Sequence, residues 1–207
     1  AKTALWIAES QMLEETKNIL YGFNDDFLPL KTYVNITEGN ALRMDWNDVI
    51  LSDQLSYIMG NPPFVGARWM SLEQKRDVEN IFKGWKSIGN LDYVSCWYKK
   101  AADYIGNNNI RAALVSTNSI TQGESVSILW KPLFESGIHI DFAYRTFVWD
   151  SEASIKAHVH CVIVGFSRFI NRIPKKIYSE GETVYAHNIN GYLLDAESIF
   201  IEKRMKP

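Results

Sequence analysis

The chain has 207 residues, of which 46% are hydrophobic and 22% are charged, and its formal net charge is −2 at pH 7. This is the composition of a globular domain with material for a core. It lacks the ~20-residue apolar run that spans a bilayer and the basic excess typical of a nucleic-acid-binding domain, so we expect no membrane partner. Cys96 and Cys161 stand alone, which excludes a disulfide framework and favours the cytoplasm.

The first part of the chain is predicted to contain one helix and two strands. Apolar residues recur near helical spacing through Lys2–Leu20, with no capping signal ahead of them. We therefore expect the chain to begin inside a helix, as an excised fragment would. A short strand at Tyr33–Thr37 leads to the loop Gly39–Leu42, and a second strand at Gln54–Gly60 leads to the loop Asn61–Phe64.

Helices and strands alternate through the rest of the chain. Helices are expected at Ser71–Phe82, Leu91–Ile105 and Glu124–Glu135, and strands at Ile110–Ser116, Ile138–Arg145 and His158–Phe166. This alternation predicts an α/β fold with an open, mostly parallel sheet and an antiparallel edge near the end. Ligands of such sheets bind at the carboxyl ends of strands, where the loops that contain Asn40 and Asn61 would form one crevice. The pattern weakens from Asn171 onward.

The loop Asn61–Phe64 is suited to hold a planar amino group. The Asn61 amide oxygen and the Pro62 carbonyl could accept both hydrogens of an aromatic amine such as that of adenine, which would draw its nitrogen towards pyramidal geometry and free its lone pair. Pro62 and Pro63 fix φ and lack an N–H, so the turn is stiff. Phe64 offers a flat face on which the base could stack. The alternative is an ordinary turn, which Asn-Pro often begins.

Charged residues after this loop allow two interpretations. The basic ones are Arg68, Lys75, Arg76, Lys83 and Lys86. They could contact phosphates, but Glu73, Asp77 and Glu79 are interleaved with them, so a solvated helix face is the alternative. We expect no metal site, because no carboxylate or cysteine lies at the usual spacing from His158 and His160.

With these motifs in place, the chain resembles the S-adenosylmethionine-dependent methyltransferases that modify the N(6) amine of adenine in DNA, in the gamma motif order. It is most similar to the methyltransferase region of type IIG and type IIL restriction–modification enzymes. The resemblance implies a Rossmann-like class I methyltransferase sheet that lacks its N-terminal strand or strands. It also implies that residues 1–170 are the central and C-terminal part of the catalytic domain, and that residues 171–207 are an exit segment towards a target-recognition domain.

The resemblance assigns roles to the two loops. The catalytic loop would consist of Asn61, Pro62, Pro63 and Phe64, with Asn61 also close to the cofactor. Gly39–Leu42 resembles the loop that receives the adenine of the cofactor. Asn40 and the Ala41 N–H would make its hydrogen bonds, with Leu42 beside them. Many relatives have Asp where Asn40 stands, and the orientation of an Asn side chain is ambiguous.

Two further segments resemble family motifs. Leu91 lies in a segment similar to the one that packs beside the cofactor. The late motif contains Phe147 and Trp149, one of which would hold the extruded base. The sequence does not decide between them, and either could instead be a core residue.

The resemblance also implies the ligands and the missing parts. The cofactor would be S-adenosylmethionine and the partner double-stranded DNA. The glycine-rich loop and the ribose-binding acid of the family would lie upstream of Ala1, so we expect this chain alone to bind the cofactor weakly and to methylate poorly. Two alternatives stay open: methyl transfer to guanine in RNA or to a glutamine amide of a translation release factor, and a non-catalytic DNA-binding remnant.

Overall fold

The computed structural model describes residues 7, 8, 10–12, 14–16, 36–149, 159–169 and 173–200. Residues 7, 8, 10–12 and 14–16 are helical, in agreement with the helix expected over Lys2–Leu20. Most of the strand predicted at Tyr33–Thr37 lies outside the described residues, and its last two residues are irregular.

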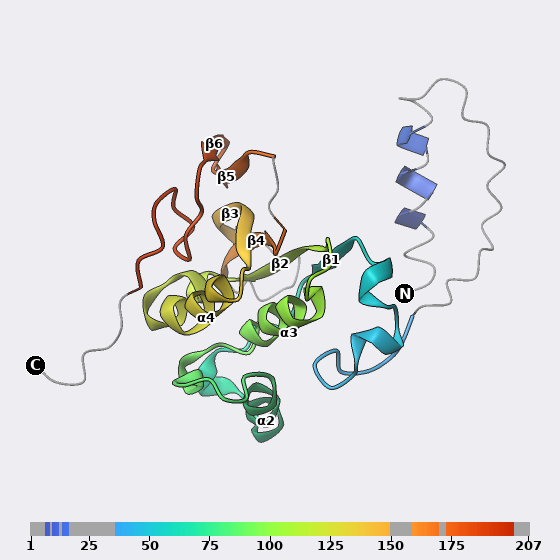
Figure 1. The fold of residues 1–207 in the computed structure, drawn as a ribbon, viewed down its shortest axis with the longest axis vertical. Coiled ribbons are helices and arrows are strands. Elements are labelled where there is room, and N and C mark those ends of the chain that lie inside the picture. Colours follow the sequence, from blue (N-terminus) through green and yellow to red (C-terminus); the bar gives the residue numbers. More distant parts are fainter. Residues whose placement is uncertain are drawn as a thin grey trace, which may run out of the picture.

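A six-stranded open sheet organises the described part of the chain (Figure 1). Its strands are β1 (Tyr57–Gly60), β2 (Arg111–Thr117), β3 (His139–Trp149), β4 (Val159–Ser167), β5 (Lys175–Ser179) and β6 (Glu182–Ala186). They lie in the order β1-β2-β4-β3-β5-β6. β1, β2, β3 and β5 run in one direction, and β4 and β6 run in the other. The expected α/β class and mostly parallel sheet are confirmed. β6 forms an antiparallel edge, while β4 lies inside the sheet.

Three helices accompany this sheet: α2 (Leu72–Ile81), α3 (Ser95–Ile105) and α4 (Gly123–Glu135). α3 and α4 pack against one face (Figure 1). Every second residue of β2 is buried, as the period of a strand requires. The core between these helices and the sheet contains aromatic rings in contact. The Tyr98 ring centroid lies 5.5 Å from that of Trp130 and 5.4 Å from that of Phe166. All three side chains are fully buried.

The sequence predicted these elements with errors at particular boundaries. α3 begins four residues after the expected Leu91, because a 3-10 helix at Ile88–Asn90 and a turn occupy the approach to it. β1 begins three residues late, since Ser52–Gln54 forms another 3-10 helix. β3 continues beyond Arg145 through an irregular register between Tyr144 and Phe147. β5 and β6 were not predicted.

The start of α2 is fixed at Ser71, after the loop that follows β1 and a 3-10 helix at Ala67–Trp69. The Ser71 hydroxyl accepts a hydrogen bond from the Gln74 N–H, and the Gln74 side-chain oxygen accepts one from the Ser71 N–H. This reciprocal capping box satisfies backbone donors that a helix N-terminus leaves unpaired.

Across the described ranges, no helix is both long enough and apolar enough to cross a membrane.

Close packing of β3 on β4 generates a stability prediction. A Cβ built at Gly165 would lie 2.0, 2.3 and 2.7 Å from three ring atoms of Phe142, the residue paired with it on β3. We expect Gly165→Ala to lower the free energy of unfolding by about 1–3 kcal/mol, because the ring has to move. Denaturant titration measures this change. Gly89→Ala is the control, since nothing lies within 4 Å of its Cβ position. Equal stability of the two variants would contradict the prediction.

Candidate functional site

A pocket of about 630 Å³ lies where β1 ends. Ala41 comes to it from the loop Gly39–Leu42, and Asn61 comes from the loop after β1. Trp46 and Trp97 also line it. The two loops that the sequence analysis assigned to one crevice therefore share a pocket with aromatic walls, although Asn40 itself is not among the lining residues.

The four residues of the loop after β1 differ in exposure. Asn61 and Pro63 are exposed, Pro62 is buried, and Phe64 is half-buried against the hydrophobic core. No hydrogen bond joins the Asn61 carboxamide to another described residue, so its oxygen is accessible as an acceptor. Asn61, Pro62 and Pro63 line the pocket, whereas Phe64 does not.

Asp92 anchors the segment that directly follows this loop. Its Oδ1 accepts a hydrogen bond from the Ala67 N–H at 2.8 Å, and its Oδ2 accepts one from the Ser119 hydroxyl at 2.5 Å. The N–H of the next residue, Tyr93, donates to the Val65 carbonyl at 2.9 Å. The segment after the loop is thereby tied both to the residues before α3 and to the residues that follow β2. Sequence reasoning did not single out Asp92.

The loop Gly39–Leu42 is held largely through its carbonyl groups. The Trp46 indole N–H donates to the Ala41 carbonyl at 2.8 Å. Lys100, on α3, donates from Nζ to the Leu42 carbonyl at 2.9 Å and to the Met44 carbonyl at 2.6 Å. Burial lowers the pKa of Lys100. Within the described residues the Ala41 N–H makes no hydrogen bond, so it remains a donor at the pocket wall.

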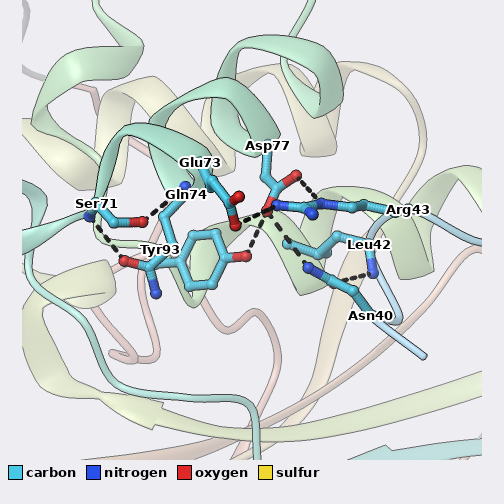
Figure 2. A network of polar contacts seen from close by, with 8 residues as sticks. All are labelled: Asn40, Leu42, Arg43, Ser71, Glu73, Gln74, Asp77 and Tyr93. Carbon is cyan, nitrogen blue, oxygen red and sulfur yellow. Dashed lines mark hydrogen bonds and ion pairs between the residues drawn. The ribbon is translucent and has the colours of Figure 1, made fainter. Parts of the chain in front are cut away.

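A buried carboxylate lies beneath the same loop. Figure 2 shows Asn40, Arg43 and Tyr93 converging on Asp77, which is 4% exposed. Arg43 donates from Nε to Oδ1 at 2.8 Å and from Nη2 to Oδ2 at 3.2 Å. Oδ2 also accepts from the Tyr93 hydroxyl at 2.8 Å and from Asn40 Nδ2 at 3.5 Å.

The environment of Asp77 sets the charge of this network. Burial raises the pKa of Asp77, but the hydrogen bonds and the charge of its partners, first of all Arg43, outweigh that effect, so the net pKa is lowered. Burial and the hydrogen bond to Asp77 raise the pKa of Tyr93 to about 12. At neutral pH the network therefore contains an ionised Asp77 and a protonated Tyr93.

Asp77 was grouped with the solvated charges of its helix in the sequence analysis, and for this residue that alternative is wrong. A signal was available, since Val78 and Phe82 are spaced to define a buried helix face and Asp77 adjoins them. The five basic residues of the same region are all exposed: Arg68, Lys75, Arg76, Lys83 and Lys86.

The other predicted site residues lie apart from the pocket. Leu42 and Leu91 are buried in the hydrophobic core and do not line it. Phe147, on β3, is half-buried, with its ring 5.4 Å from that of Tyr144 in an edge-on contact. The Trp149 backbone pairs with Val159 on β4, and its side chain lies outside the description.

The described residues contain no group of three or more His, Cys, Asp or Glu side chains that could hold a metal ion. His158 lies outside them.

Comparison with known proteins gives matches along the whole chain. A family model described as the MmeI DNA-methyltransferase domain matches residues 1–179. The chain is 42% identical over 209 residues to DNA methyltransferase A of Bacillus subtilis (strain 168), and the match covers 100% of this chain and 24% of that protein. The solved structure of the type IIL restriction–modification enzyme MmeI in complex with DNA is 45% identical, with a TM-score of 0.86 over 99% of this chain and 28% of that one. The chain thus spans about a quarter of the length of these relatives.

The contacts of Asp92 generate a prediction about the loop after β1. We expect Asp92→Ala to speed hydrogen exchange at the Ala67 amide and to lower the free energy of unfolding by about 1–3 kcal/mol, because two donors lose their acceptor. Exchange followed by mass spectrometry measures the local effect. The control is Asp103→Ala, which removes an exposed ion pair with Lys99 on α3 and should cost less than about 1 kcal/mol. Unchanged exchange at Ala67 in Asp92→Ala would be the contrary result.

Proposed function

The chain belongs to the family of MmeI DNA-methyltransferase domains, and we propose that it transfers a methyl group from S-adenosylmethionine to the exocyclic amine of an adenine extruded from duplex DNA. It would do so as part of the complete gene product that contains residues 1–207. The observation that supports this most strongly is the shared pocket, in which Ala41 of one loop and the exposed Asn61 of the other are wall residues. MmeI itself was solved in complex with DNA, which supports a DNA substrate.

The pocket suits the cofactor in size and chemistry. Its volume of about 630 Å³ falls within the range of small-molecule sites, which are mostly apolar with a few polar groups. Trp46 and Trp97 offer flat surfaces for a purine, and the Ala41 N–H offers a donor to a ring nitrogen. These residues would hold the adenosine part of S-adenosylmethionine. When bound, the cofactor supplies a methyl group activated by a sulfonium centre.

In this proposal the protein contributes position rather than acid–base chemistry. The Asn61 amide oxygen and the Pro62 carbonyl accept the two hydrogens of the target amine and direct its lone pair along the line of transfer. The amine nitrogen releases a proton only after it has gained positive charge, so the site needs no general base beforehand. Asp92 would support this geometry by holding the backbone at Ala67. Such support matters because even small displacements of a reacting group lower the rate steeply.

Extrusion of the base has a cost of a few kcal/mol, which contacts with the flipped base offset. Stacking on an aromatic ring contributes ~1–3 kcal/mol per base. Phe64 is a candidate for this contact because it is the last residue of the loop and packs partly against the core. Phe147 and Trp149 on β3 stay as candidates for a second aromatic. The exposed basic residues that follow Phe64, Arg68 among them, would contact DNA phosphates.

The role of Asn61 is tested by Asn61→Ala in the complete gene product. We expect methyl transfer to fall by at least about 100-fold, because the amine loses one of the two acceptors that orient it. Calorimetry with S-adenosylhomocysteine should show cofactor affinity largely retained. Radiolabelled transfer is measured on DNA, on RNA and on a translation release factor, and DNA should be the acceptor.

Asn109→Ala is the matched control for this variant. Asn109 is also exposed, but it lies in the turn before β2, at the opposite end of the parallel pair β1–β2. Its transfer rate should equal that of the unaltered protein. Near-normal turnover by Asn61→Ala, or preferential methylation of RNA or of the release factor, would contradict the proposal.

The role of Phe64 is tested with DNA that carries 2-aminopurine at the target position. This base fluoresces more strongly when it leaves the stack, and a ring that captures it alters that signal. We expect Phe64→Ala to weaken capture by about 5- to 100-fold, as the loss of ~1–3 kcal/mol of stacking requires. Phe64→Tyr retains the ring and should behave like the unaltered protein. A fluorescence titration unchanged in Phe64→Ala would rule out stacking at this residue.

A further inference from the structure

The Asn40 carboxamide is oriented by the groups on its two sides. Its Oδ1 accepts a hydrogen bond from the Leu42 N–H at 2.9 Å, and its Nδ2 donates to Asp77 Oδ2 at 3.5 Å (Figure 2). A flipped amide would bring its NH₂ against the Leu42 N–H and its oxygen against the Asp77 carboxylate. Both contacts would be unfavourable, since each pairs two donors or two acceptors. Two independent neighbours therefore select the same orientation.

The identity of the residue at position 40 follows from the same contacts. An aspartate there could still accept from the Leu42 N–H with one oxygen, but its other oxygen would meet the ionised Asp77 carboxylate. Arg43 already gives Nε and Nη2 to Asp77. Like charges at this separation repel and raise the pKa of one partner. The buried acid on α2 thus favours asparagine over aspartate in the loop.

We propose that Asp77 is a positioning residue for cofactor binding. Asp77 fixes the orientation of the Asn40 carboxamide, and this orientation determines which hydrogen-bonding groups the loop Gly39–Leu42 presents. This inference rests on the proposed function. With Nδ2 directed at Asp77, the Asn40 side chain offers the cofactor the remaining lone pair of Oδ1, an acceptor, and the Ala41 N–H offers a donor beside it. An acceptor next to a donor matches the amine and the adjacent ring nitrogen of an adenine.

A residue exchange tests this in the complete gene product. We measure the affinity for S-adenosylhomocysteine by calorimetry in Asn40→Asp, in Asp77→Asn and in the exchange Asn40→Asp with Asp77→Asn. Asn40→Asp should weaken binding by about tenfold, which corresponds to ~1.4 kcal/mol. The exchange should recover part of the lost affinity, because the amide introduced on α2 can donate to the carboxylate introduced in the loop, with the polarity of the bond reversed. Recovery is incomplete because that amide nitrogen replaces Oδ2, which accepts from Arg43 Nη2 and from the Tyr93 hydroxyl. In steady-state assays the loss should appear in KM for the cofactor more than in kcat.

The pH dependence gives a second measurement on the single variant. In Asn40→Asp the two facing acids share a raised pKa, so affinity should recover as the pH falls from about 8 to about 5.5, when one acid becomes protonated and donates to the other. The unaltered protein should show no such recovery. The charged and titratable groups around the pair are Arg43, Tyr93, Cys96 and Glu73. The pKa is about 12 for Tyr93 and for Cys96 and is raised for Arg43, so these three keep their charge state in this range.

Glu73→Gln is the control for the fourth group. Glu73 is an exposed partner of Arg43 at 3.5 Å and does not contact Asn40, so its removal should leave cofactor affinity unchanged. If the unaltered protein binds no S-adenosylhomocysteine, the proposed function itself fails. If it binds, but Asn40→Asp binds equally well or shows no recovery at low pH, Asp77 does not orient Asn40. A folded exchange variant, with a normal thermal midpoint, that binds as weakly as Asn40→Asp overturns the inference as well.

Discussion

A carboxylate enclosed by protein stays ionised only where hydrogen-bond donors replace the water that it has lost. Asp77 takes those donors from Asn40, Arg43 and Tyr93. This requirement ties α2 to the loop Gly39–Leu42 through Asn40, which lies 37 positions from Asp77 in the sequence. Asp92 accepts hydrogen bonds from the Ala67 N–H, just after the loop that follows β1, and from the Ser119 hydroxyl. Neither acid lines the pocket. Both loops that border it are therefore supported by acidic side chains outside the pocket lining, and no charged residue is among the lining residues that the structure describes.

The sequence correctly predicted the features that are determined by residues close together in the chain. The start of α2 after Ser71, the alternation of β2 and the stop at Gly137, whose φ is +91°, each depend on residues close in the chain. β5 and β6 were missed for a related reason. Four of the five residues of β6 are exposed, so the strand lacks the alternation of apolar and polar residues by which a half-buried strand is recognised. Its pairing with β5 is visible only in three dimensions.

In the candidate site too, some features depend on neighbouring residues and others on residues far away in the sequence. The loop Asn61–Phe64 is recognisable from its own residue types, because stiffness and acceptor groups are local properties. The orientation of Asn40 is not local, since it depends on a helix whose other charged residues are exposed to solvent. Leu42 and Leu91 lie in segments that resemble cofactor-binding motifs, yet their side chains are core residues. Sequence motifs thus located the loops, while the roles of Asp77 and Asp92 in holding the surrounding segments were not predicted.

Helix α3 and the residues before it connect to both loops. Asp92 and Tyr93 accept and donate hydrogen bonds at the segment that follows the loop after β1. Trp97 lines the pocket, and Lys100 donates to the carbonyls of Leu42 and Met44, at and just beyond the end of the loop Gly39–Leu42. A ligand that shifts one loop therefore acts on the element that supports the other. Thermodynamic linkage makes such an effect reciprocal. Any factor by which a ligand held by one loop changes the affinity for a ligand held by the other must equal the factor for the reverse effect, and α3 is an element with contacts on both sides.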